Sequence, residues 1–289
     1  MKVCLSCRES FDSTSWTCPH CSWTPDRVDN HWVFAPELSQ SNDGYDVELF
    51  EKLDAIEQDH FWDVARHRLF TWALQQYLPE TKKLLEIGSG RGNVIKSFRK
   101  AFPALELWGT EIYASGLNSI LRNVPDAHVL QLDARHIPFK EEFDTVAAFD
   151  VLEHIDEDEA VLAEMHKAVR SGGGAMISVP QHPFLWSARD EVLYHKRRYT
   201  RAELTRKVRA AGFEPIRTTS FISLPFPMMV ISAMRNRKLK PDYDPWAELK
   251  MAPVTNKALG TVLSMERMLI QQGVSMPVGG TLFMVARKR

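Results

Sequence analysis

The sequence has almost no excess charge of either sign, with 36 Lys and Arg residues against 37 Asp and Glu residues. Proteins that bind nucleic acid mainly through phosphates usually have a basic excess, so nucleic acid is not an expected partner. The chain also lacks an apolar run of the roughly 18–20 residues that a transmembrane helix needs. No signal peptide is visible in the polar segment from Met1 to Cys21. We therefore expect a cytoplasmic protein.

Cysteine is scarce, and all four cysteines lie near the start of the chain as two C-x-x-C pairs. In a reducing compartment, clustered cysteines hold metal more often than they form disulfides. Two such pairs supply four thiolates in the tetrahedral arrangement that zinc prefers, and four protein ligands leave no open position for catalysis. The sequence therefore predicts a zinc ribbon over residues 1–30, with redox-active thiols as the alternative. The ligands of this structural zinc would be Cys4, Cys7, Cys18 and Cys21.

The remaining chain divides into three parts. Residues 31–80 form a predicted helical cap, because apolar residues recur at spacings of three and four from Val47 to Leu78 before Pro79 ends the helix. Short apolar runs then alternate with segments of helical length over residues 81–215, which is typical of a doubly wound α/β sheet. Residues 216–289 are assigned to a lid insertion and C-terminal strands. The predicted strands are Lys83–Ile87, Leu105–Glu111, Ala127–Leu132, Phe143–Phe149, Gly174–Val179, Phe213–Phe221 and Thr281–Ala286.

A glycine-rich turn follows the first predicted strand, with glycines at positions 88, 90 and 92. Such a turn lets backbone N–H groups approach a ligand closely, although a tight turn without a ligand is the alternative for this motif alone. Glu86 would repel the pyrophosphate of a dinucleotide but attract the ammonium and sulfonium charges of S-adenosylmethionine (SAM). The glycine spacing also departs from the dinucleotide pattern. The turn therefore favours SAM as the cofactor.

Two further acids end the next two predicted strands. Glu111 follows the glycines by about 20 residues, where a carboxylate can accept both ribose hydroxyls. Asp133 ends the third strand, where it can accept a hydrogen bond from an adenine amino group. Either acid alone fits a loop residue or a helix cap equally well. Their order after the glycine turn favours a nucleoside ligand.

The series of motifs resembles class I SAM-dependent methyltransferases over about residues 60–215, in particular the bacterial UbiE/UbiG-like domains. The matching motifs are Leu85–Gly92, Gly109–Glu111, Asp133-Ala134, Phe143-Asp144, Asp150–Ile155 and Ser171–Gly174. The resemblance implies a Rossmann-like, doubly wound, seven-stranded sheet with an antiparallel final strand. It also implies that the cofactor lies at the carboxyl ends of the strands.

The resemblance assigns parts of the cofactor to these motifs. The first glycines and Glu86 would line the methionine portion, and the acids that end the next two strands would take the ribose and the adenine. The family's lead-in helix is similar to the second segment, so Phe61 is also expected to close over SAM. The implied cofactor contacts are Trp62, Arg66, Glu86, Gly88, Gly90, Glu111, Ile112, Asp133, Ala134, Asp150 and Val151.

Methyl transfer from a sulfonium requires an aligned nucleophile, and an oxygen nucleophile usually needs a general base. His154 is one candidate base, although a role in ordering the turn fits it equally well. Residues 190–200 resemble a segment of bacterial methyltransferases of polysaccharide and lipid-linked sugar biosynthesis, which adds Asp190 and His195 as catalytic candidates. A solvated basic loop with Thr200 as a helix cap is the alternative. The expected activity is methylation, at oxygen, of a small molecule or lipid-linked saccharide.

An apolar stretch from Phe221 to Met234 precedes a basic cluster at residues 235–238. It is too short and too interrupted by proline to span a membrane. The favoured interpretation is a buried lid helix with a solvated basic end. The alternative is peripheral membrane contact beside anionic lipid.

Two other functions compete with this prediction. A zinc ribbon before a SAM domain also resembles ribosomal RNA guanine methyltransferases, and Trp16, Trp23 and Trp32 are aromatic residues that could stack on bases. The near-neutral charge and the lack of a recognisable base-flipping segment disfavour this alternative. A SAM-binding protein without catalytic activity is the second alternative. The sequence indicates no oligomeric state.

Overall fold

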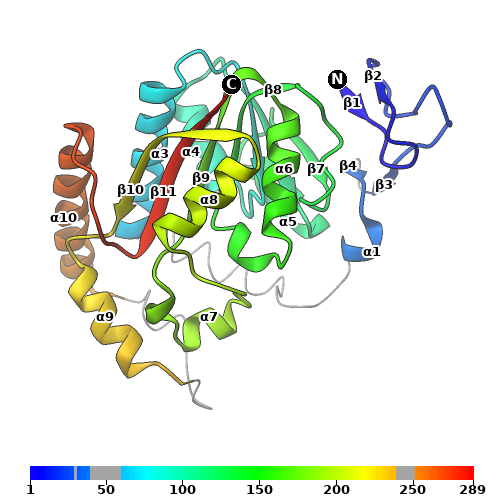
Figure 1. Cartoon of the computed structure of the whole chain (residues 1–289). Helices are drawn as coiled ribbons and strands as arrows, with labels where there is room; N and C mark the ends of the chain where they lie inside the picture. Colours follow the sequence, from blue (N-terminus) through cyan, green and yellow to red (C-terminus); the bar gives the residue numbers. More distant parts are fainter. Residues whose placement is uncertain (29–30, 40–59, 239–250) are drawn as a thin grey trace.

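The computed structural model describes residues 1–28, 31–39, 60–238 and 251–289. Within these ranges a nine-stranded sheet forms the centre of the molecule (Figure 1). Its order is β10 (Phe213–Phe221), β11 (Thr281–Lys288), β9 (Val169–Pro180), β8 (Phe143–Phe149), β5 (Lys83–Ile87), β6 (Glu106–Glu111), β7 (His128–Gln131), β4 (His31–Val33) and β3 (Asp26–Val28). The strands from β9 to β4 are parallel, and β11 is antiparallel to both neighbours. The predicted Rossmann-like α/β fold is confirmed.

Helices cover both faces of the sheet. The apolar side chains of α3 (Phe61–Tyr77), α4 (Asn93–Ala101), α5 (Ala114–Asn123) and α10 (Pro253–Gln271) share one buried cluster. Those of α6 (Asp158–Ala168) and α8 (Arg201–Ala210) belong to the cluster on the other face. On α3, Phe70 stacks against Phe149 with ring centroids 4.1 Å apart, which fixes this helix over the end of β8. The predicted helix over residues 47–78 is thus confirmed from Phe61, and residues 47–59 lie outside the described ranges.

The N-terminal segment forms a small unit that is joined to the sheet. Strands β1 (Lys2–Val3) and β2 (Ser10–Phe11) pair as a hairpin, and β4 adds to β7 at the edge of the main sheet. A short helix, α1 (Pro36–Ser39), follows. The ring of Trp16 is only 6% exposed and packs edge-on against Phe34 and Phe139. Trp16 is therefore a core residue and is not exposed for the base stacking that the RNA alternative requires.

Helices α9 (Phe226–Arg235) and α10 lie at the opposite edge of the sheet from this N-terminal unit (Figure 1). After β9 come η2 (Pro183–Leu185) and α7 (Ala188–Val192), and after β10 come α9 and α10. No side chain of α9 is buried, so the favoured prediction of a buried lid helix is wrong. None of the helices in the described ranges is long and apolar enough to cross a membrane.

Candidate functional site

Two cavities meet at the glycine turn, at the carboxyl ends of the parallel strands. The first has a volume of about 630 Å³ and extends from this turn toward α9 and α10. The second has a volume of about 700 Å³ and extends along the ends of β6 and β7. Both cavities are lined by Gly88, Gly90, Asp150 and His154. A ligand that spans this junction reaches both the glycine turn and the turn after β8.

Two glycines shape the junction because their backbones take left-handed conformations, with φ of 63° at Gly88 and 55° at Gly90. A Cβ atom at Gly88 would lie 2.6 Å from Cγ2 of Val151, so this position is closed to a side chain. A Cβ atom at Gly90 would meet nothing within 4 Å. The space beside Gly90 is therefore open to a ligand, as the glycine motif predicts.

Glu86 lies at the first cavity with only 2% of its surface exposed. Its Oε2 has no hydrogen-bond partner among the described residues. Burial raises the pKa of this carboxyl to about 8. An unpartnered buried carboxyl group is a costly feature unless a ligand supplies the missing donor or charge. The side chain therefore suits the cationic methionine portion of SAM.

Glu111 and Ile112 line the second cavity at the end of β6. The Glu111 carboxylate accepts hydrogen bonds from the backbone N–H of Gly90 at 2.9 Å and of Ile112 at 2.8 Å. These bonds hold the carboxylate between the glycine turn and the next strand end. Burial nevertheless raises its pKa. Its oxygens retain lone pairs for ribose hydroxyl groups.

Asp133 and Ala134 line the same cavity at the end of β7. The Asp133 carboxylate accepts a hydrogen bond from the backbone N–H of Arg135 at 2.9 Å and forms an ion pair with the Arg135 guanidinium. An adenine amino group at this place would share the acid with Arg135. The three acids predicted to hold the cofactor thus lie along one continuous path.

The predicted closing residues of α3 lie across the first cavity. Arg66 forms an ion pair with Asp150, and the guanidinium of Arg66 lies 4.2 Å from the ring centroid of Trp62. The other oxygen of Asp150 accepts a hydrogen bond from Ser178 at 3.1 Å. Trp62, Arg66, Asp150 and Val151 therefore surround the junction, and Phe61 also lines the first cavity.

The three catalytic candidates form a connected group. Nδ1 of His195 donates a hydrogen bond to Asp190 at 2.9 Å, and the ring of His195 lies 4.7 Å from that of His154. Burial, followed by the charge of His195, lowers the pKa of His154 to about 4. Asp190 is fully buried, and its burial is outweighed by hydrogen bonds from His195 and Arg198, which lower its pKa to about 2. His154 and His195 line the cavity, whereas Asp190 supports His195 from behind.

Glu153 is a further site residue to which the sequence analysis assigned no role. It belongs to η1 (Leu152–His154), it is 1% exposed, and it lines the first cavity. Neither carboxylate oxygen has a hydrogen-bond partner among the described residues. The sequence feature that could have identified Glu153 is its position beside His154 in the turn after a buried strand. Such a turn faces the ligand-binding edge of the sheet.

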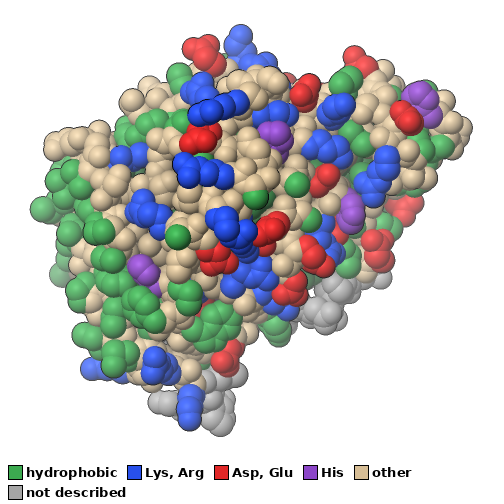
Figure 2. Space-filling model, viewed as in Figure 1, with side chains coloured by type: hydrophobic (Ala, Val, Ile, Leu, Met, Phe, Trp, Pro, Cys, Tyr) green, Lys and Arg blue, Asp and Glu red, His purple; other side chains and the backbone are tan. Residues whose placement is uncertain are grey.

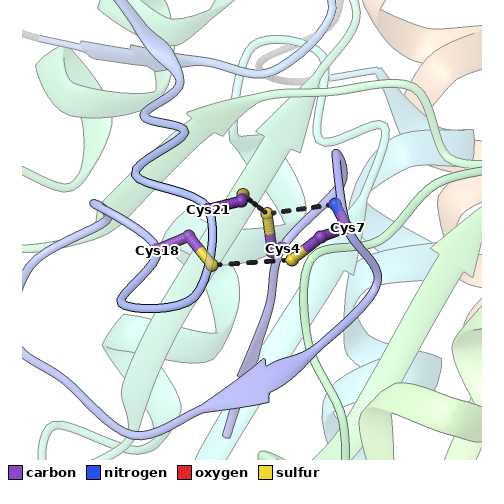
Figure 3. A group of neighbouring side chains, drawn as sticks. All are labelled: Cys4, Cys7, Cys18 and Cys21. Carbon is purple, nitrogen blue, oxygen red and sulfur yellow. Dashed lines mark hydrogen bonds between the residues drawn. The ribbon is translucent and has the colours of Figure 1, made fainter.

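The four cysteines come together in the N-terminal unit (Figure 3). Sγ of Cys4 lies 3.6 Å from that of Cys21, and Sγ of Cys7 lies 3.7 Å from that of Cys18. Zinc–sulfur bonds of about 2.3 Å in a tetrahedron place sulfur atoms about 3.8 Å apart. These two separations match those of a tetrahedral zinc site. Backbone N–H groups of Cys7 and His20 also point to cysteine sulfurs.

Comparison with known proteins agrees with this geometry. The family model described as "Methyltransferase domain" matches residues 55–218. The ubiquinone/menaquinone biosynthesis C-methyltransferase UbiE of Ralstonia pickettii is 36% identical over 116 residues, which are 38% of this chain and 47% of that protein. UbiE of Burkholderia orbicola is 37% identical over 101 residues, covering 33% and 42%. The chain spans about half the length of these curated relatives.

Solved structures share the fold at low sequence identity. Phosphoethanolamine N-methyltransferase 2 of Haemonchus contortus, in complex with SAM, gives a TM-score of 0.57 at 16% identity, covering 86% of this chain and 58% of that chain. A complex of the Trm112 methyltransferase activator and a putative methyltransferase of Haloferax volcanii gives 0.51 at 15% identity, covering 83% and 93%.

The family match covers more than half of the chain, and the cavity at the glycine turn has the acids and the open glycine that the cofactor requires. The chain therefore belongs to the methyltransferase domain family and carries a class I SAM-dependent methyltransferase domain.

Proposed function

We propose that this protein methylates an oxygen atom of a small molecule or a lipid-linked saccharide. The observation that carries the proposal is the composition of the first cavity. At one end it is lined by the glycine turn and by Glu153, His154 and His195. At the other end it is lined by apolar side chains of α9 and α10, namely Met228, Met229 and Leu259. Such a cavity fits an acceptor with a polar reacting group and an apolar portion.

The polar end supports oxygen as the acceptor atom. A hydroxyl group must lose its proton as its oxygen attacks the methyl carbon, the C–S bond breaks and S-adenosylhomocysteine leaves. The cluster of Glu153, His154 and His195 supplies groups for this activation, and Asp190 positions His195. The curated relatives are named C-methyltransferases, so carbon is the competing acceptor atom.

The surface beside the cavity supports a lipid-linked acceptor. On α9, Met228 is 60% exposed, Ile231 50% and Met234 67%. Apolar side chains gather along the side of the molecule formed by α9 and α10 (Figure 2). Basic residues Arg235, Arg237 and Lys238 follow directly after the apolar face of α9. We propose that this face rests on a membrane surface that contains anionic lipid, because apolar burial and basic charge there act together.

The proposal is tested by incubating the full-length protein with methyl-labelled SAM and either a lipid extract or an aqueous extract of bacterial cells. We expect label in the lipid extract. Treatment of the purified product with hydriodic acid should release the label as methyl iodide, because this reagent cleaves O-methyl ethers and leaves C-methyl groups in place.

Each other outcome overturns a defined part of the proposal. Label in the lipid product that resists hydriodic acid would indicate carbon as the acceptor atom. Label confined to a water-soluble product would exclude the lipid-linked acceptor. Labelling of added ribosomal RNA, with neither extract labelled, would establish the RNA alternative.

A further inference from the structure

One cluster beside the cofactor cavity has the donor set of a metal site. Each of Glu153, His154 and His195 offers one ligand atom, and these atoms all lie within 4.8 Å of one another. The first two come from the turn after β8, and the third comes from the loop after α7. The cluster is separate from the four cysteines, which form the other such group among the described residues.

The state of Glu153 indicates a missing partner. Its carboxylate is 1% exposed, and neither oxygen has a hydrogen-bond partner in the described part of the chain. A buried carboxylate without partners is strongly unfavourable, so such groups take up a proton, pair with a cation or coordinate a metal. The two neighbouring donors are imidazoles, with rings 4.7 Å apart and nearly perpendicular. Imidazole nitrogens and a carboxylate oxygen together suit divalent first-row transition metals.

The hydrogen bonds that hold His195 are those expected for a metal-binding histidine. Its Nδ1 donates to Asp190 at 2.9 Å, which directs the other ring nitrogen, Nε2, to a different partner. Asp190 is itself held by Arg198, whose Nε lies 2.7 Å from Oδ1, and by the backbone N–H of Ser187 at 2.9 Å. A carboxylate behind a histidine is the usual outer-shell arrangement of metal sites, because it fixes the tautomer and the ring orientation.

We propose that Glu153, His154 and His195 bind a divalent transition-metal ion that faces the first cavity. Three protein ligands leave coordination positions for the acceptor. This inference rests on the proposed O-methylation and gives it a chemical route. The metal binds the acceptor hydroxyl and lowers its pKa, and the proton passes to solvent. The oxygen lone pair then forms the bond to the methyl carbon as the C–S bond of SAM breaks, with S-adenosylhomocysteine as the leaving group.

The test uses Mn²⁺, which thiolate sites bind weakly and which paramagnetic resonance detects while it is free in solution. Full-length protein with zinc in the ribbon is passed over a chelating resin and titrated with Mn²⁺ in the absence of acceptor. We expect the wild-type chain to bind Mn²⁺ and Glu153→Gln to lose about ten-fold or more in affinity. Glu159→Gln, the same change at an exposed position on α6, is the matched control.

The outcomes separate this inference from the proposed function. No Mn²⁺ binding by the wild type, or equal binding by Glu153→Gln, would overturn the metal site even if the methylated product is an ether. If Glu153→Gln fails to fold by circular dichroism, His195→Gln replaces it, and unchanged Mn²⁺ affinity in that variant has the same consequence. Mn²⁺ binding together with a C-methylated product would support the metal site and overturn the proposed O-methylation.

Discussion

Asp190 has no exposed surface, and its Oδ1 accepts a hydrogen bond from Nδ1 of His195 at 2.9 Å. The same carboxylate forms an ion pair with Arg198, whose side chain is only 11% exposed. One buried acid therefore orients a cavity residue and neutralises a guanidinium that is largely shielded from solvent. Its removal should affect the stability of the fold as well as the site.

We expect Asp190→Asn to lower the free energy of unfolding by about 3 kcal/mol, because it leaves the largely shielded Arg198 charge without its partner. Urea unfolding measures the change. Glu191→Gln is the matched control, since Glu191 is the next residue and is exposed. Equal unfolding of the two variants would show that the Asp190–Arg198 pair contributes nothing to stability.

Glu111→Gln should weaken binding of S-adenosylhomocysteine about ten-fold or more, because hydrogen bonds to a charged acceptor contribute about 1.5–3 kcal/mol. Isothermal calorimetry with S-adenosylhomocysteine and with NAD measures the effect. The control is Glu106→Gln, at the exposed beginning of the same strand. NAD should not bind either protein. Unchanged affinity of Glu111→Gln would remove this acid from the ribose site.

Binding of SAM should release a proton near neutral pH. Burial raises the pKa of Glu86 to about 8, so the carboxyl is mostly protonated at pH 7 before SAM binds. The positive charges of SAM favour the ionised form and lower this pKa in the complex. The affinity for SAM should therefore rise as the pH rises toward 8 and level off above it.

Calorimetry in buffers of different ionisation enthalpy measures the released proton directly. Glu86→Gln should abolish the buffer dependence and flatten the pH profile. S-adenosylhomocysteine lacks the sulfonium charge, so it should release a smaller fraction of a proton than SAM. Equal proton release by Glu86→Gln and the wild type would assign the titration to another group.

The four-cysteine site should contain zinc and stabilise the N-terminal unit. Thiol modification should release the metal to a chromogenic chelator, because it removes all four ligands. Cys7→Ser should lose the zinc and melt at a lower temperature than the wild type. The control is Ser6→Ala, which changes the neighbouring side chain and leaves the four thiolates in place. Protein that is stable, fully folded and free of zinc would contradict this assignment.

The exposed face of α9 should bind vesicles that contain anionic lipid. Replacing Ile231 and Met234 by Glu should reduce co-sedimentation with such vesicles about ten-fold or more, because burying each apolar side chain contributes about 1.5–3 kcal/mol. Val28→Glu is the control, since Val28 is also apolar and 47% exposed but lies on β3. Equal sedimentation of all variants would exclude α9 as the membrane-binding face.

The central sheet was readable from the sequence because its strands are buried on both faces. The predicted bounds of β5 and β8 agree with the structure to the residue, since both strands are mostly apolar and all but one of their residues are buried. Strand β3 gave no such signal, because all its residues are exposed at the edge of the sheet. Strand β9 begins five residues earlier than predicted, at Val169 rather than Gly174. Its glycines read as a loop, although Gly173 is required where a Cβ would lie 2.4 Å from the carbonyl oxygen of Asp144.

The residues of the cofactor cavity could be predicted from local sequence motifs. The acceptor side of the cavity depends instead on contacts between residues that are far apart in the sequence. Glu86, Gly90 and Glu111 each stand at a strand end or turn that the sequence marks. The approach of His195 to Glu153 and His154 depends on how the loop after α7 returns to the turn after β8. Helix α10, which packs on α3, lies in a segment that was assigned only to the lid and the last strands. No short-range pattern in the sequence predicts these contacts between distant segments.

One continuous backbone segment, the turn after β8, lines both the cofactor cavity and the proposed acceptor cavity. Asp150, with φ of 55°, borders both cavities, and Glu153 and His154 follow three and four residues later on η1. In the proposed reaction, this short piece of backbone therefore sets the spacing between the methyl donor and the methyl acceptor, and α9 and α10 contact the apolar portion of the acceptor. Under this proposal, substitutions on those two helices would change which acceptor fits, and the reacting groups on the turn after β8 would keep their positions.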